Sequence, residues 1–352
     1  MHVVAVVEAE GHVCCRYRIA AFRPHLEAAG HRLSVRALAG GLWHRLRVLR
    51  SVRDADAVVL QRKLLSRVEF ALLRRSARRL IFDFDDALWL RDSYSDKGFD
   101  SPRRRRRFLR TVAGCDTVVA GNRYLARAVG TGPGSARPAA REVGSPVALP
   151  PHLAGGRGIA VIPTCVDPTG YPLADHTRTG AAVRLVWLGS SSTLQALERN
   201  RELLDALGAA VPGLRLKVIC DRFPTFDALP VDAVPWRADT EAAELAAADI
   251  GIGWVPDDPW SRGKCGLKLL QYHAAGLAVV ANPVGVQGEM VRSHQTGFAA
   301  RTVAEWVAAV RALTADPVLR LHFGRAGRQQ VETTYGVAAG GAAWVRLLEA
   351  GR

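Results

Sequence analysis

The chain has 352 residues, of which 49% are hydrophobic, and this is enough for two ordinary domains with full cores. Its formal net charge of +15 favours an anionic partner, although a compositional bias toward Arg would give the same charge. The six cysteines show no paired spacing, so we expect reduced thiols in a cytoplasmic protein and no metal site. The sequence also predicts no signal peptide and no membrane-spanning helix.

The first elements predict a βαβ unit: a strand over Val3–Val7, a helix from near Arg18 to about Ala29, and a strand over His31–Val35. Ligands of such sheets bind beyond the carboxyl ends of the strands. The loop before the helix lacks GxGxxG, so a dinucleotide site is not expected. It carries Arg16 and Arg18, which could hold a phosphate or an acceptor anion, or could be ordinary surface arginines.

Two further strands are predicted at Ala57–Gln61 and Leu80–Phe84, and the second ends in the acidic run Asp83-Phe-Asp-Asp86. Acids at a strand end are costly unless they are solvated, paired or used in chemistry. Asp85 and Asp86 could therefore take part in the chemistry of a site at this strand end. Alternatively, they cap the backbone or pair with Arg. A haloacid-type phosphatase is disfavoured because Ala87 stands where its motif needs Thr.

The segment Ser101–Arg110 reads SPRRRRRFLR and predicts a helix with arginines on all sides. Arg103–Arg107 therefore form a solvated patch, which could also contact anionic lipid or nucleic acid. A strand follows at Asp116–Ala120. Residues 131–158 are rich in Gly, Pro and Ala and predict a loop or a partly disordered insertion.

A strand at Ile159–Ile162 leads to Pro163-Thr-Cys-Val-Asp167 and then to a polar linker over residues 168–182. After the next strand, Val183–Leu188, comes Gly189-Ser-Ser-Ser-Thr193, followed by a helix to about Leu207. Gly189, Ser190 and Thr193 at a strand-to-helix turn suit phosphate binding, and simple helix capping is the alternative.

The stretch from Gly251 to Asn282 predicts a strand at Ile252–Val255, a polar loop, a helix over Lys264–Ala275 and a strand over Leu277–Ala281. On that helix Lys264, Lys268 and Gln271 would share one stripe at i, i+4 and i+7. Cations in a first helical turn are unfavourable, and a bound anion would offset this. Backbone N–H groups near Gly266 and Leu267 would point at the same anion. The alternative is a solvated basic helix end.

The remaining elements continue the α/β alternation. Strands are expected at Leu214–Cys220 and Val231–Trp236, and helices at Thr240–Ala247, Val303–Leu313, Pro317–Thr334 and Gly340–Glu349.

The segment Gln271–Ala281 (QYHAAGLAVVA), together with Ile162–Asp167 (IPTCVD), resembles GT-B-fold glycosyltransferases of the family-4-like retaining type. The Lys-Cys-Gly-x-Lys-x-x-Gln form is similar to a divergent branch of that family. The family has Glu at the positions of Gly263 and Gln271, where it contacts the donor sugar and the ribose. It also has cations near residues 189–193, and Lys264 and Lys268 could supply that charge here.

The resemblance implies an α/β fold with two Rossmann-like, doubly wound parallel-sheet domains facing a cleft. The expected boundaries are 1–167 for an acceptor-side domain, 168–182 for a hinge and 183–335 for a nucleotide-sugar domain. The last stretch, 336–352, is expected to be a helix that packs back on the first domain.

The implied activity is transfer of a sugar from a nucleotide-diphosphate donor to a glycan or lipid-linked acceptor, with retention of anomeric configuration, as in polysaccharide biosynthesis. Donor-binding residues would be Gly189, Ser190, Thr193, Lys264, Gly266, Leu267, Lys268 and Gln271, with Lys268, Asp85 and Asp86 catalytic. By their position in the family's pattern, Asp85 or Asp86 would orient the acceptor hydroxyl or stabilise positive charge on the donor sugar. No metal, cofactor or nucleic acid is expected, and Arg103–Arg107 could bring a cytoplasmic protein to the inner membrane face. A non-catalytic sugar-nucleotide sensor and a GT-B epimerase or phosphorylase are the alternatives.

Overall fold

The computed structural model describes residues 1–131, 158–177 and 182–350. Contacts divide the chain into two compact units. The first comprises Met1–Cys165, Asp258–Cys265 and Val337–Arg352, and the second comprises Val166–Asp257 and Gly266–Gly336. Residues 132–157 of the loop expected at 131–158, and residues 178–181 of the expected linker, lie outside the described residues. No helix in the described ranges is long and apolar enough to cross a membrane.

A six-stranded parallel sheet forms the centre of the first unit, with strand order β2-β1-β3-β4-β5-β6. Most of its central positions are buried on both faces, which is why these strands read as nearly continuous apolar runs. The strands are β1 (His2–Val7), β2 (Arg32–Ala37), β3 (Ala57–Gln61), β4 (Leu80–Phe84), β5 (Thr117–Ala120) and β6 (Gly158–Val161).

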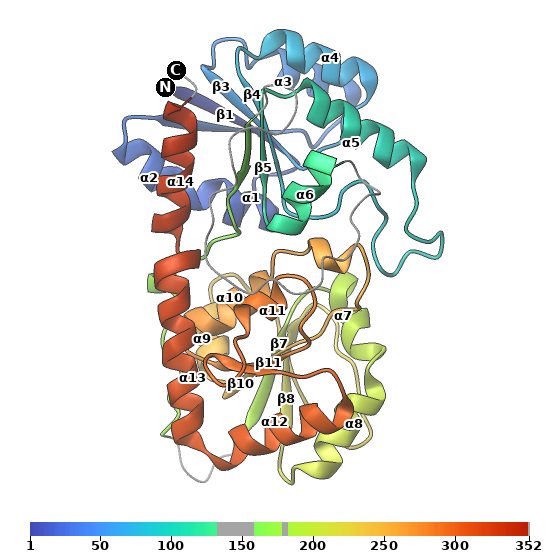
Figure 1. Cartoon of the computed structure of the whole chain (residues 1–352), viewed down its shortest axis with the longest axis vertical. Helices are drawn as coiled ribbons and strands as arrows, with labels where there is room; N and C mark the ends of the chain where they lie inside the picture. The colour runs from blue at the N-terminus through green and yellow to red at the C-terminus, as the bar shows by residue number, and fades with distance from the viewer. Residues whose placement is uncertain (132–157, 178–181, 351–352) are drawn as a thin grey trace. The chain divides into compact units, whose positions relative to one another are not determined.

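Helices cover both faces of this sheet (Figure 1). One core contains buried residues of α3, α4, α5 and α6, such as Leu49, Leu73 and Phe108. The other contains residues of α1, α2 and α14, including Trp344. These helices are α1 (Val13–Arg18), α2 (Arg23–Ala28), α3 (Leu42–Arg50), α4 (Arg67–Ser76), α5 (Pro102–Gly114), α6 (Arg123–Thr131) and α14 (Val337–Glu349).

The second unit has its own six-stranded parallel sheet, with strand order β12-β11-β10-β7-β8-β9. Its strands are β7 (Arg184–Leu188), β8 (Arg215–Cys220), β9 (Val231–Pro235), β10 (Ile250–Gly253), β11 (Ala278–Ala281) and β12 (Gly297–Ala299). Its helices are α7 (Ser191–Glu198), α8 (Arg201–Ala210), α9 (Glu241–Ala246), α10 (Leu267–Ala274), α11 (Gln287–Met290), α12 (Val303–Ala315) and α13 (Pro317–Gln330).

Two predicted helices are broken into shorter pieces. The helix expected from Arg18 to Ala29 is α1, a 3-10 turn and α2, and α1 already begins at Val13. A proline in the first turn of α2 supports a new helix start there. The helix expected at 194–207 is α7 and α8, separated at Arg199 and Asn200.

The expected position of Lys264 on a helix is wrong. The helix α10 begins only at Leu267, because its N-cap Gly266 has the left-handed backbone angle φ +67°. Lys264 has an extended backbone and follows the 3-10 turn Ser261–Gly263. The predicted stripe of Lys264, Lys268 and Gln271 therefore does not form. The preceding strand, β10, also begins and ends two residues earlier than expected.

Candidate functional site

In both units polar residues follow the strands where the strand order reverses. The reversal lies between β1 and β3 in the first unit and between β7 and β10 in the second. Open parallel sheets bind ligands outside the carboxyl ends of strands at such points. We therefore describe the two sets of residues one after the other.

In the first unit Arg18 forms a buried ion pair with Asp83. Its guanidinium donates to both carboxylate oxygens at 2.5 and 3.0 Å, and also to the carbonyl oxygen of Ile162. Its side chain is only 1% exposed. Arg18 thus joins β4 to the end of β6, and its donors are used inside the unit. Arg16 is exposed instead, with its guanidinium 5.0 Å from the ring centre of Tyr17.

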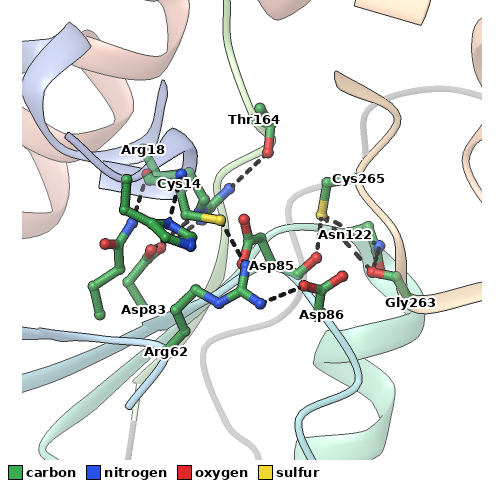
Figure 2. A network of polar contacts seen from close by, with 12 residues as sticks. Cys14, Arg18, Arg62, Asp83, Asp85, Asp86, Asn122, Thr164, Gly263 and Cys265 are labelled. Carbon is green, nitrogen blue, oxygen red and sulfur yellow. Dashed lines mark hydrogen bonds and ion pairs between the residues drawn. The ribbon is translucent and has the colours of Figure 1, made fainter. Parts of the chain in front are cut away.

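Arg62 lies between the two other acids of the run (Figure 2). One Nη atom is 3.0 Å from Asp85 and the other is 2.6 Å from Asp86. The first also donates to the Cys14 sulfur at 2.6 Å. Arg62 directly follows β3 and has φ +42°, an uncommon conformation for a residue with a side chain. This backbone turns the guanidinium toward the end of the neighbouring strand, β4.

The two carboxyl groups have opposite shifts in pKa. Burial raises the pKa of Asp85, but the guanidinium groups of Arg62 and then Arg18 outweigh it, so the net shift is downward. For Asp86, burial and the charge of Asp85 outweigh Arg62 and raise the pKa. Burial also raises the pKa of Cys14, so its thiol is neutral. The side chains of Asp85 and Asp86 remain 11% and 16% exposed, and a ligand can still reach them.

The segment Asp258–Cys265 completes this corner of the first unit. Asn122, just after β5, donates to the carbonyl oxygens of Gly263 and Lys264 at 3.0 and 3.1 Å, and the Cys265 thiol donates to the backbone oxygen of Asp85 (Figure 2). A Cβ at Gly263 would lie 2.9 Å from the backbone nitrogen of Ala87. The close approach explains why this position carries no side chain.

In the second unit, the side chain of Lys268, which belongs to α10, reaches the carboxyl end of β7. Its Nζ is 3.8 Å from the ring centre of Trp187 and 3.3 Å from the hydroxyl oxygen of Thr193. A Cβ at Gly189 would come within 2.8 Å of both Lys268 Nζ and Thr193 Oγ1. The absence of a side chain at Gly189 therefore allows the Trp187 ring, the ammonium group and the hydroxyl to pack against the backbone at this turn. The structure thus brings together Gly189, Thr193 and Lys268, three of the residues predicted to bind the donor.

At the start of α7, the hydrogen-bond donors of Ser191 are bound to an acidic side chain of the same unit. Asp221 accepts hydrogen bonds from the backbone N–H and the hydroxyl of Ser191 at 2.6 and 2.8 Å. These bonds lower the pKa of Asp221 to about 2. Ser190 and Thr193 form the capping arrangement considered as the alternative, with Thr193 Oγ1 accepting from the Ser190 N–H. Asp221 was not among the residues that the sequence pattern predicted for this site.

Gln271 belongs to a buried polar cluster. Its amide nitrogen donates to Glu241 at 2.8 Å and to the Tyr171 hydroxyl at 3.3 Å. The other carboxylate oxygen of Glu241 accepts from the Trp236 indole N–H at 2.6 Å. A carboxylate therefore lies beside Gln271, but it comes from α9 instead of α10. The indole of Trp236 is about half exposed at the carboxyl end of β9.

Sequence reasoning missed Arg62, Glu241, Trp187 and Tyr171 as members of these clusters. Arg62 could have been found from the sequence, because it directly follows the predicted strand at Ala57–Gln61. Among the described residues, no group of three or more His, Cys, Asp or Glu side chains is arranged to hold a metal ion.

Comparison with known proteins identifies the architecture. The chain matches sucrose-phosphate synthase from Thermosynechococcus elongatus with a TM-score of 0.68 at 14% identity, covering 99% of each chain. HepE from Anabaena, solved with UDP and glucose, matches with a TM-score of 0.67 at 15% identity, covering 99% of this chain and 100% of that one. A glycosyltransferase from Rickettsia africae matches with a TM-score of 0.67 at 11% identity, covering 99% and 98%.

The fold is therefore that of the two-domain GT-B glycosyltransferases, and the expected fold class is confirmed. Residues 198–343 match the family model described as glycosyl transferase-like. No curated protein sequence matches the chain. Together this family match and the fold support a transferase.

Proposed function

We propose that this protein transfers a sugar from a nucleotide-diphosphate donor to a glycan or lipid-linked acceptor with retention of anomeric configuration. The observation that carries the proposal is the arrangement of Lys268, Thr193 and Gly189 at the reversal point of the second sheet. An ammonium group and a hydroxyl beside the backbone of a glycine suit a diphosphate. Retention is taken from the resemblance of the 271–281 segment to retaining enzymes.

The chemical role of this cluster is to stabilise the leaving diphosphate. Negative charge grows on the diphosphate as the bond to the sugar breaks, and a fixed cation at that place lowers the barrier. Lys268 supplies the cation. The first-turn N–H groups of α10, near Gly266 and Leu267, lack acceptors within the helix and supply further donors. On this proposal the reaction needs no metal ion.

We assign the nucleoside to the cluster of Trp236, Glu241 and Gln271. The half-exposed indole ring of Trp236 offers a surface on which a base can stack, and Glu241 supplies a carboxylate for the ribose hydroxyls. Glu241 thus takes over the role that the resemblance gives to a Glu at the position of Gln271. UDP is the first nucleotide to test, because HepE was solved with UDP.

The acceptor is assigned to Asp85 and Asp86 in the first unit. Arg62 holds Asp85 as an anion, which can orient an acceptor hydroxyl or stabilise positive charge on the sugar. Asp86, whose pKa is raised, is the better proton acceptor of the two. Arg18 is left out of the assignment because its donors are used within the unit.

The experiment is a thermal-shift titration with UDP, GDP, ADP and TDP, repeated with Lys268→Met and Glu241→Gln. A nucleotide at a hundred times its dissociation constant adds about 2.7 kcal/mol of stability. We expect one nucleotide to shift the wild-type protein and both substitutions to reduce the shift. No shift with any nucleotide would contradict the proposal.

Product analysis then tests the reaction itself. The donors are sugar conjugates of the nucleotide that shifts the unfolding temperature, and the acceptors are glycans or lipid-linked sugars. We expect a new glycosidic bond with the anomeric configuration of the donor. An inverted product would overturn retention. Binding of the donor without turnover of any acceptor, or conversion of the donor without acceptor, would favour the sensor or the epimerase instead.

A further inference from the structure

On one face of the first unit the charged side chains are almost all positive. The helices α3, α4 and α5 cover the same side of the sheet, and α3 and α4 lie next to each other (Figure 1). Together they contain twelve arginines and a single acid, Glu69. Glu69 is buried and paired with Arg45 at 2.7 Å, so it does not offset the surface charge. We call this surface the arginine face.

The charge is dense enough to affect the arginines themselves. Burial, followed by the charge of nearby Arg103, lowers the pKa of Arg107. Arg47 and Arg50 of α3 make no ion pair with any residue that the structure describes, and Arg103–Arg106 are exposed. An anionic partner would relieve this repulsion.

The same face carries exposed apolar side chains. Trp43 is 82% exposed, Leu42 60% and Val68 72%. Of the five large apolar residues exposed in the described part of the first unit, four lie on these three helices. On α3, Trp43, Leu46, Arg47 and Arg50 follow each other at i, i+3, i+4 and i+7 and line an open concavity with Ser51.

We infer that the arginine face binds an anionic lipid bilayer, with Trp43 and Leu42 inserted at the boundary between headgroups and acyl chains. A surface that combines arginines with Trp and aliphatic residues meets both layers of such an interface. The arginines would bind lipid phosphates, for which the guanidinium geometry is well suited. This inference concerns a surface outside the nucleotide site and holds whether or not the proposed transfer occurs.

The aliphatic residues distinguish a bilayer from a nucleic acid. Arginines and an aromatic ring would serve a polyanion equally well, since they bind phosphates and stack on bases. Leu42 and Val68 gain nothing from that partner, whereas insertion of apolar side chains into lipid is favourable. The expected arginine patch at 103–107 is thus one part of the larger arginine face. The most exposed apolar side chains of this face lie on α3 and α4.

The test is sedimentation of the full chain with vesicles of phosphatidylcholine alone or mixed with phosphatidylglycerol. We expect binding to the mixed vesicles only. Arg47→Glu with Arg50→Glu should weaken it roughly tenfold or more, since each basic residue near such a surface contributes about 1 kcal/mol. The control is Arg325→Glu with Arg346→Glu, the same charge change at exposed positions outside the face, which should retain most of the binding.

A second pair of variants tests the apolar part. Trp43→Ser and Val68→Ser leave the charge unchanged and remove exposed side chains, so their unfolding midpoints should match the wild type. We expect each to weaken vesicle binding several-fold, and we expect Val68→Ser to leave binding to a single-stranded oligonucleotide unchanged. No binding to mixed vesicles, an equal loss in the control variant, or full vesicle binding by Trp43→Ser would each overturn the inference.

Discussion

The ammonium group of Lys268 lies 3.8 Å from the centre of the Trp187 ring. Trp187 is fully buried in β7, so the ring is a fixed platform. A cation over an aromatic face gains about 0.5–2 kcal/mol. The contact holds a flexible side chain in one place before any ligand arrives, which reduces the entropy lost on binding an anion.

Replacing Lys268 by Met should affect catalysis much more than folding. The aliphatic stem and the contact with Trp187 survive, while the charge that would stabilise the diphosphate is lost. We expect kcat/KM for sugar transfer to fall about 10²- to 10³-fold, as for removal of one transition-state donor. The free energy of unfolding should change by less than about 1 kcal/mol. Lys97→Met, at an exposed position, is the control, and near-normal turnover of the Lys268 variant would refute its role.

Replacing Arg62 by Gln should destabilise the first unit. Two carboxylates would lose their shared partner, and we expect the free energy of unfolding at pH 7 to fall by about 1–3 kcal/mol. This is less than for a fully buried ion pair, because all three side chains are partly exposed. Below pH 5 the gap to the wild type should narrow, because protonation of Asp85 and Asp86 removes the unpaired charge. Urea denaturation at several pH values measures this.

The matched control for that experiment is Arg237→Gln. Arg237 pairs with Asp239, but both side chains are about two-thirds exposed. Such a pair contributes little, so the substitution should be nearly neutral at every pH. If both variants behaved alike, the cluster around Arg62 would be no more than a surface ion pair.

Restoring the acid that the resemblance expects at Gly263 should harm the protein. Its Cβ would meet the Ala87 backbone at 2.9 Å and Leu125 at 3.1 Å, so Gly263→Glu must displace the segment from Asn122. We expect the free energy of unfolding to fall by about 1–3 kcal/mol and the rate of sugar transfer not to increase. Gly41→Glu, where a Cβ has open space in the same unit, is the control. An increase in rate without loss of stability would show that the acid is tolerated.

His273 should make the second unit sensitive to mild acid. It is fully buried in α10, and burial lowers its pKa to about 4. The unfolded chain takes up a proton below about pH 6.5, whereas the folded state does not. Stability should therefore fall as the pH drops from about 6.5 toward 4, by roughly 2 kcal/mol at pH 5.

Unfolding followed at pH 7 and pH 5 measures this loss. His273→Leu cannot take up the proton, so its free energy of unfolding should fall less between pH 7 and pH 5 than that of the wild type. His322→Gln, at an exposed position on α13, should lose as much as the wild type. An unchanged pH response in the Leu variant would show that another group is responsible.

The parallel sheets could be predicted because their strands are buried on both faces. For Ala57–Gln61 and Leu80–Phe84 the predicted and observed bounds are identical. The helix α3 was not predicted, because its apolar residues point both to the core and to solvent. Leu49 is fully buried while Trp43 is exposed, and this mixture hides the helical period.

The polar clusters were harder to predict because their members come from different elements. Arg62 and Asp85 meet only because β3 and β4 are neighbours in the sheet, and Gln271 meets Glu241 because α10 packs on α9. The position of Lys264 depended on one backbone angle at Gly266, which local pattern does not reveal. Pairings between strands and helices are set by the tertiary structure.

The first unit is built from three separate stretches of chain, and this affects how the protein folds during synthesis. All six strands of its sheet leave the ribosome before Gly263 and Cys265, which pack beside Asn122 and Asp85. Trp344, which covers the other face, follows only near the end. Domains generally fold as units once their chain is available. The N-terminal unit should therefore be the last to finish folding, although its synthesis starts first.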